Sequence, residues 1–146
     1  MLTFTNQAAL SYRNRVRYSN LTTGQIADAL VLSKEALTPE TVGADRQVTY
    51  TFTIENEGNA ATSPEDQVTV TDTFDPALID LTVTLDGASL AQPGGYTYDE
   101  GTGAFATVPG ILTVPAATYT QDPATGVYTA EPGEAVLVVT GTIQTN

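Results

Sequence analysis

The chain of 146 residues contains no cysteine, no histidine and no tryptophan. Without cysteine it forms no disulfide bond, and without cysteine and histidine it cannot build the usual zinc sites. Catalysis by a Cys–His pair or a Ser-His-Asp triad is excluded as well. No other nucleophile–base pair stands out, and the acidic loops lack the spacing of a calcium-binding loop. We therefore expect no enzymatic activity, no metal and no cofactor.

Positive charge is scarce and unevenly placed. Five Lys and Arg residues stand against 17 Asp and Glu residues, which leaves a net charge of −12. The first 27 residues hold Arg13, Arg15 and Arg17 and no acid, whereas Lys34 and Arg46 are the cations among all 17 acids. So acidic a surface argues against a nucleic-acid partner. The segregation indicates either simple solubility or a basic arm that docks on an acidic body.

Long hydrophobic runs are also missing, so we expect no membrane insertion. The opening residues, MLTFTNQ, have neither a charged n-region nor an apolar h-region, and we predict no signal peptide. The last residues show no sorting motif and no hydrophobic tail. The route by which such a chain would leave a cell is left open.

The residues that are abundant indicate an all-β protein. Strand-forming residues are frequent, and 12 glycines and 8 prolines mark turns along the chain. The clearest strand covers residues 46–55, where inward apolar positions alternate with Thr and Glu; a second covers residues 67–74. Residues 135–145 are apolar on both faces, which is typical of a central strand. Shorter strands are predicted at residues 81–85, 96–98, 104–108, 111–114 and 117–120. This pattern predicts a Greek-key β-sandwich of the immunoglobulin-like or fimbrial type.

Residues 1–18 are predicted to form one long strand, followed by a linker at residues 19–28 and the sandwich domain at residues 29–146. The even positions of this donor strand are apolar, except that Asn6 falls on the same face. The apolar members are Leu2, Phe4, Ala8, Leu10 and Tyr12. Residues 26–36 could form a short helix, but alternation favours a strand from Ala29.

Three polar residues interrupt three separate apolar faces: Asn6, Lys34 and Asp72. A desolvated amine is neutral and nucleophilic, and a protonated acid can hydrogen-bond the carboxamide and shuttle protons. These groups could therefore form a Lys34–Asn6 isopeptide bond assisted by Asp72, with loss of ammonia. Two alternatives stay open: an unreacted buried polar cluster, or a Lys34 side chain that reaches the surface without any contact.

Four stretches of the chain resemble, in this order, a conserved-repeat domain of unknown function from Gram-positive bacterial surface proteins. The stretches are LVLSKEA, DRQVTYTFTIENEG, VTVTDTF and GEAVLVVTGTI. The resemblance covers roughly residues 29–146 and extends to isopeptide-forming domains of fimbrial subunits. Members of that family close with a strand of the type T-N-x-A-x-x-S-Y, which here stands at residues 5–12 instead. The resemblance implies that the family's reactive Lys, acid and Asn correspond to Lys34, Asp72 and Asn6.

A sandwich that lacks its last strand exposes an edge and an apolar groove. The N-terminal strand can fill the groove of its own chain or that of the next copy. Donation between copies predicts a head-to-tail homopolymer, the structural subunit of a pilus-like filament on an extracellular cell or spore surface. The alternative is a monomeric, self-complemented adhesin or carbohydrate-binding module that uses exposed tyrosines. Its candidates are Tyr96, Tyr98, Tyr119 and Tyr128.

Overall fold

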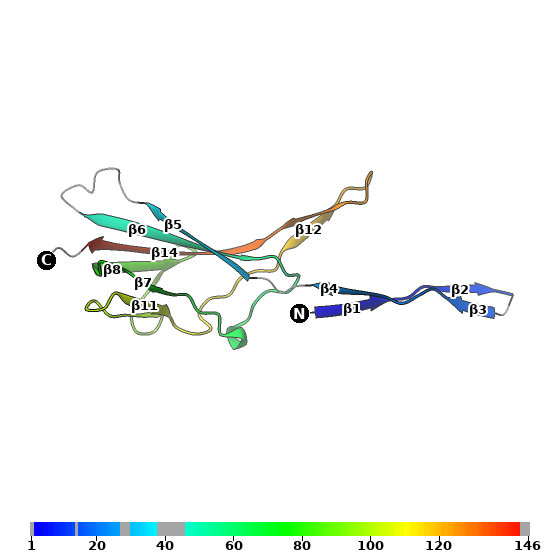
Figure 1. The fold of residues 1–146 in the computed structure, drawn as a ribbon, viewed down its shortest axis with the longest axis horizontal. Helices are drawn as coiled ribbons and strands as arrows, with labels where there is room; N and C mark the ends of the chain where they lie inside the picture. Colours follow the sequence, from blue (N-terminus) through cyan, green and yellow to red (C-terminus); the bar gives the residue numbers. More distant parts are fainter. Residues whose placement is uncertain (1, 14, 27–29, 38–45, 144–146) are drawn as a thin grey trace.

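The computed structural model describes residues 2–13, 15–26, 30–37 and 46–143 (Figure 1). Within these ranges the secondary structure is β-strand, apart from one 3-10 turn at Pro64–Asp66. All strand pairs are antiparallel. The all-β class expected from the composition is thus confirmed.

The larger of two facing sheets has five strands in the order β5-β6-β14-β8-β9. Their bounds are Leu30–Leu37, Gln47–Asn56, Gly133–Ile143, Leu78–Leu85 and Ala88–Leu90. Strand β14 is central, as its two apolar faces predicted, and it pairs with β6 along nearly its whole length. Alternate residues of β6 and β14 point into the core because successive side chains of a strand face opposite sides.

The smaller sheet has three strands in the order β10-β11-β7. These are Tyr96–Tyr98, Ala104–Thr107 and Thr71–Thr73. One hydrophobic core lies between the sheets, with Phe52 and Leu137 on one side and Phe105 on the other. The rings of Tyr50 and Phe74 stack across it, with centroids 5.0 Å apart. This two-sheet arrangement is consistent with a β-sandwich.

Two predicted strands differ from the observed ones. Residues 67–70 do not belong to β7: Gln67 has a left-handed φ of 51°, and Val70 instead exchanges bonds with Thr107. Residues 111–114 form no regular strand, although Leu112 and Val114 are fully buried. Their alternation reflects burial in the core rather than strand pairing. Strands β9 and β13 were not predicted.

The prediction of one long strand over residues 1–18 is wrong. The chain forms β1 (Leu2–Asn6) and β2 (Ala9–Tyr12), turns, and returns as β3 (Arg15–Tyr18) and β4 (Thr22–Ile26). Strand β4 lies in the stretch expected to be a linker. β1 pairs with β4 and β2 with β3, and Arg13 has a left-handed φ of 45° at the turn. The chain therefore pairs locally, β2 with β3, instead of staying extended.

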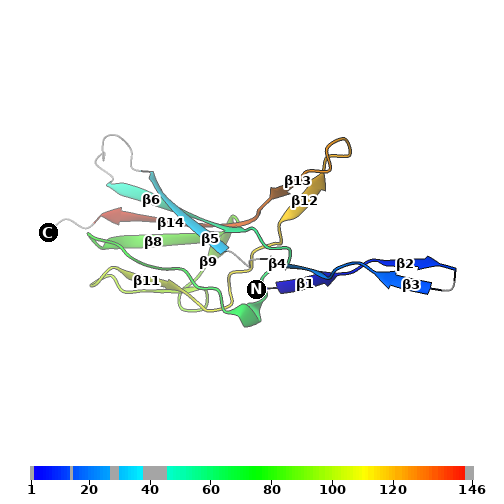
Figure 2. The same cartoon turned by 45° about the vertical axis from the view of Figure 1, so that its right-hand side comes forward.

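These four strands form one antiparallel ribbon, called the N-terminal ribbon below. Figures 1 and 2 both show it extending away from the two sheets. Ser19 joins its two halves: its N–H donates to the Ala8 carbonyl at 2.9 Å, and its Oγ accepts from the Ala8 N–H at 3.0 Å.

A second hairpin, β12 (Thr118–Gln121) with β13 (Tyr128–Glu131), projects from the same end of the sandwich as the ribbon (Figure 2). All residues of its two strands are exposed. At its base the Tyr119 hydroxyl donates to the Glu57 carbonyl at 2.7 Å.

Candidate functional site

An apolar groove separates the outer strand of the large sheet from the segment that leads into β7. It measures about 130 Å³ and is lined by Leu30, Leu32, Ile54, Val68, Thr69 and Val70. Ile54 and Val70 form a buried floor, each 3% exposed, whereas Leu30 and Leu32 on the rim are 42% and 55% exposed. Large apolar side chains at such exposure mark a surface that lacks its cover.

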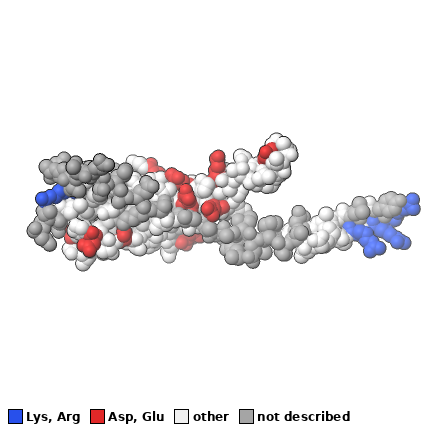
Figure 3. All heavy atoms as spheres, turned by 45° about the horizontal axis from the view of Figure 1, so that its top comes forward, with Lys and Arg blue, Asp and Glu red and all other residues white. Residues whose placement is uncertain are grey.

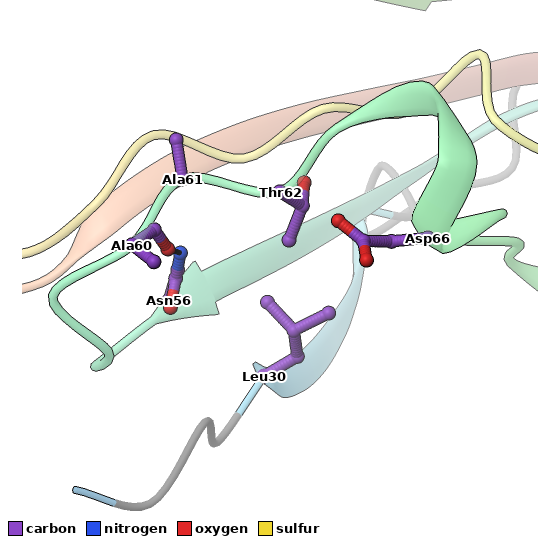
Figure 4. A pocket seen from close by; sticks show the side chains of 6 residues that line it. All are labelled: Leu30, Asn56, Ala60, Ala61, Thr62 and Asp66. Carbon is purple, nitrogen blue, oxygen red and sulfur yellow. Dashed lines mark hydrogen bonds between the residues drawn. The ribbon is translucent and has the colours of Figure 1, made fainter. Parts of the chain in front are cut away.

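The groove continues past Leu30 into a second hollow of about 200 Å³. Figure 4 shows Leu30 pointing from β5 toward Asp66, with Thr62 beside them. Asn56 stiffens this end, because its amide donates to the Ala60 carbonyl at 2.8 Å and its Oδ1 accepts the Gly58 N–H at 2.9 Å. Both polar ends of this buried side chain are satisfied, so Asn56 has a structural role.

The outer strand β5 borders one side of the groove, and the segment that leads into β7 borders the other. In the part of the chain that the structure describes, β5 pairs only with β6, and β7 pairs only with β11. Each sheet therefore offers an unpaired backbone edge there. A strand added at this place could hydrogen-bond to an edge while its alternate side chains fill the groove.

The N-terminal ribbon is exposed wherever its side chains are described. Val16 and Tyr18 are 51% and 68% exposed. Arg13, Arg15 and Arg17 lie at its far end. Figure 3 shows this basic end well away from the acids, which are spread over the sandwich and the β12–β13 hairpin.

The structure places the three predicted isopeptide residues on different elements. Asn6 lies in β1 opposite Thr22, and Lys34 lies in β5 opposite Phe52; the side chains of Asn6 and Lys34 are outside the described part. Asp72 lies in β7, half-buried, and its Oδ1 accepts the Thr73 N–H at 2.8 Å. Because β1 belongs to the projecting ribbon, this fold does not bring Asn6 to Lys34 and Asp72 within one chain. The bond stays a prediction.

The four tyrosines proposed as exposed binding residues divide into two pairs. Tyr119 and Tyr128 are 45% and 64% exposed, as predicted, and their role in binding stays a prediction. Tyr96 is only 6% exposed, and the Tyr98 hydroxyl is bonded to both the N–H and the carbonyl of Leu78. Burial raises the pKa of the Tyr98 phenol. Tyr96 and Tyr98 therefore belong to the folded core rather than to a binding surface.

The exposure of Leu30 and Leu32 was missed. Their alternation along β5 indicates an apolar face but not whether a neighbour covers it. The one available signal was the expectation of a sandwich open at one edge, which predicted a groove without saying which residues line it.

Among the described residues no helix is long and apolar enough to cross a membrane, and no group of His, Cys, Asp or Glu could hold a metal ion. Comparison with known proteins returns no matching family model, no matching curated protein and no matching solved structure. The proposals below therefore start from the groove, the ribbon and the hairpin.

Proposed function

We propose that this chain is the structural subunit of a pilus-like filament on an extracellular cell or spore surface. Each copy would insert its N-terminal ribbon into the groove of the next copy. The observation that carries the proposal is an open apolar groove between two sheet edges in a chain whose exposed ribbon projects from the body. The added strand would complete the Greek-key sandwich expected from the sequence.

The dimensions of ribbon and groove are compatible. The stretch from Leu2 to Tyr12 spans about 36 Å at roughly 3.3 Å per residue, and β5, with 8 residues, spans about 26 Å. Strands β1 and β2 each have one partner among the described residues, so each keeps a second backbone edge. The ribbon could therefore add to β5 or β7 without first separating its own strands.

The donor and acceptor surfaces are different parts of the chain, so the contact is heterologous. Such a contact repeats from copy to copy and generates an open fibre unless the rotation closes a ring. The basic end of the ribbon and the acidic sandwich would also attract each other, which speeds association at low salt.

If the ribbon is donated, the predicted covalent bond would join two copies. Lys34 Nζ would attack Asn6 Cγ of the inserted ribbon, a C–N bond would form, and ammonia would leave with the proton taken through Asp72. The product would be a filament cross-linked without disulfides.

The test is assembly of purified protein, followed by negative-stain microscopy and sedimentation. Leu32→Glu introduces a charge at an exposed rim position, so we expect the monomer to fold normally and filaments to disappear. Ser89→Glu in β9 is the matched control, because it adds the same charge at the other edge of the sheet. Filaments of Leu32→Glu, or a wild-type chain that stays monomeric at every concentration, would contradict the proposal.

A monomeric adhesin or carbohydrate-binding module is the second candidate, favoured by the exposed Tyr119 and Tyr128. Aromatic rings that stand free of a core are common in binding surfaces. A glycan screen with the monomeric Leu32→Glu protein distinguishes the two functions, because saccharide binding lost in Tyr128→Ser would support the module.

A further inference from the structure

Two hairpins of the chain have separate turns of the same geometry. The sequences DEGTG and DPATG occupy residues 99–103 and 122–126. In each, the Asp Oδ1 accepts the N–H groups two and three residues on, and the closing glycine has a φ near +74° or +73°. The backbone bonds from Gly103 to Asp99 and from Gly126 to Asp122 are also equivalent.

The aromatic residues around these turns also correspond, yet their burial is opposite. Tyr96 and Phe105 lie three residues before and six after the first Asp; they are 6% and 2% exposed and contact each other in the core. Tyr119 and Tyr128 hold the same places around the second Asp and are 45% and 64% exposed. The second hairpin thus carries the aromatic pair of a buried hairpin with no cover from the described residues.

The groove leads to this aromatic face. Asn56 lines the second hollow, which shares Leu30 with the groove. Glu57 follows Asn56, and its carbonyl accepts the Tyr119 hydroxyl at 2.7 Å. A ribbon that fills the groove is longer than β5 and therefore extends beyond this end. The turn and β3, which carries Arg15 and Arg17, would extend beyond this end of the groove.

Acidic residues and strand polarity both suit a basic turn at the hairpin end of the sandwich. Glu57, Asp66 and Glu131 are exposed: Asp66 lines the second hollow, Glu57 follows the last residue of β6, and Glu131 ends β13. All described strand pairs are antiparallel, and β5 begins at Leu30, which lines both hollows. A ribbon strand added antiparallel to β5 would therefore place the turn after Tyr12 at the Leu30 end, close to these acids.

We propose that Arg15 and Arg17 of one copy dock on the Tyr119/Tyr128 face and on Glu57 of the next copy. This inference rests on the proposed function and adds a second contact to it. The register places Arg15 opposite Tyr12 and Arg17 opposite Leu10, so both arginines belong to the apolar face of the ribbon that would enter the groove. Planar guanidinium groups stack on tyrosine rings and pair with carboxylates, which suits this combination of residues.

The experiment uses two full-length variants that cannot polymerise. Leu32→Glu blocks the groove and leaves a donor, and Phe4→Asp disables the ribbon and leaves an acceptor; a mixture should give a 1:1 complex whose Kd is measured by sedimentation. Tyr128→Ser in the acceptor should weaken that complex about tenfold. Val127→Ser, an equally exposed neighbour, is the control and should leave the Kd unchanged.

Two further variants identify the partners. The double change Arg15→Lys and Arg17→Lys in the donor keeps the charge but loses the stacking on tyrosine. It should therefore weaken binding to the acceptor that keeps Tyr128. It should have little further effect on binding to the Tyr128→Ser acceptor. Glu57→Lys in the acceptor should weaken binding, and a donor with Arg15→Glu and Arg17→Glu should restore it.

The outcomes separate the two claims. A complex whose Kd is the same with Tyr128→Ser as with Val127→Ser overturns the arginine–tyrosine contact and leaves strand donation standing. The absence of any donor–acceptor complex overturns both.

Discussion

Gly103 and Gly126 close two turns of the same geometry, but their surroundings differ. Both have a positive φ, which a glycine adopts without strain. A Cβ on Gly103 would collide with the carbonyl oxygen of Phe74, whereas on Gly126 the nearest atom is Nε2 of Gln121 at 3.8 Å. At the scale of the residue, Gly103 is therefore required both by its turn and by the packing of Phe74, whereas Gly126 is required only by its turn.

Substituting these glycines by alanine should separate the two roles. Gly103→Ala must move the backbone of Phe74, so we expect a loss of several kcal/mol in the free energy of unfolding. Gly126→Ala should cost about 1 kcal/mol, confined to the hairpin, because only the positive φ is disfavoured. Thermal unfolding of both variants checks this; equal melting temperatures would contradict it.

The Asp122 carboxylate predicts a local pH dependence. The Ala124 N–H, and then Thr125, hydrogen-bond this carboxylate and hold its pKa below the ordinary value of 3.8. Because the pKa is lowered in the folded turn, the stabilisation is fully present above pH 3.8 and is lost as the pH falls through the lowered pKa.

An NMR titration should show the Ala124 and Thr125 amide shifts moving with the Asp122 carboxyl below pH 3.8. Asp122→Asn should abolish this titration. Amide shifts that move at higher pH, or that persist in Asp122→Asn, would show that another group is responsible.

At the scale of the element, two strands of one sheet use leucine for different purposes. Leu137 of the central β14 is fully buried, whereas Leu32 of the outer β5 is 55% exposed. The first stabilises the fold, and the second forms the rim of the groove that we propose for the ribbon. An apolar position in a strand is thus not sufficient evidence of a core position.

Leu137→Ala should lower the free energy of unfolding by roughly 2–5 kcal/mol, because it removes buried methyl groups and leaves a cavity. Leu32→Ala should change it by no more than about 0.5 kcal/mol but should weaken assembly. Denaturant unfolding and filament sedimentation on the same samples give both values. A strongly destabilised Leu32→Ala would mean that this side chain is covered in the free monomer.

At the scale of the whole molecule, the chain combines an acidic sandwich with a basic, projecting ribbon. The ribbon has few contacts to protect it while it is free, and the groove leaves apolar side chains in water. If the ribbon of one copy covers the groove of another, both the exposed ribbon and the exposed apolar side chains become buried. Assembly by strand donation accounts for both exposed surfaces with one event.

A covalent bond between copies should appear in denaturing electrophoresis. If Lys34 reacts with Asn6 of the next copy, as proposed, boiled wild-type filaments should give a ladder in SDS, and each bond should lower the mass by one ammonia. Lys34→Ala should abolish the ladder while filaments still form. Ladders that persist in Lys34→Ala would assign the bond to other residues, and intact mass without loss of ammonia would exclude it.

The sequence by itself determined the all-β class, the main strands β6 and β14, and the positions of β6 that alternate toward a core. The inward positions of β6, such as Val48, Phe52 and Ile54, are buried as their period of two predicted, because that period follows from backbone geometry alone. The central place of β14 could be predicted from its two apolar faces for the same reason. Asn6, Lys34 and Asp72 could be singled out because each breaks such a pattern.

Only the tertiary structure decided which apolar surfaces stay uncovered. Tyr96 and Tyr119 have nearly the same local sequence, yet one is buried and the other exposed, because burial depends on what packs above a strand. The return of the first strand at Arg13 depends on the pairing of β2 with β3, and the exposed rim at Leu30 and Leu32 depends on what covers β5. Periodicity carries no information on such partners, since it describes one strand at a time.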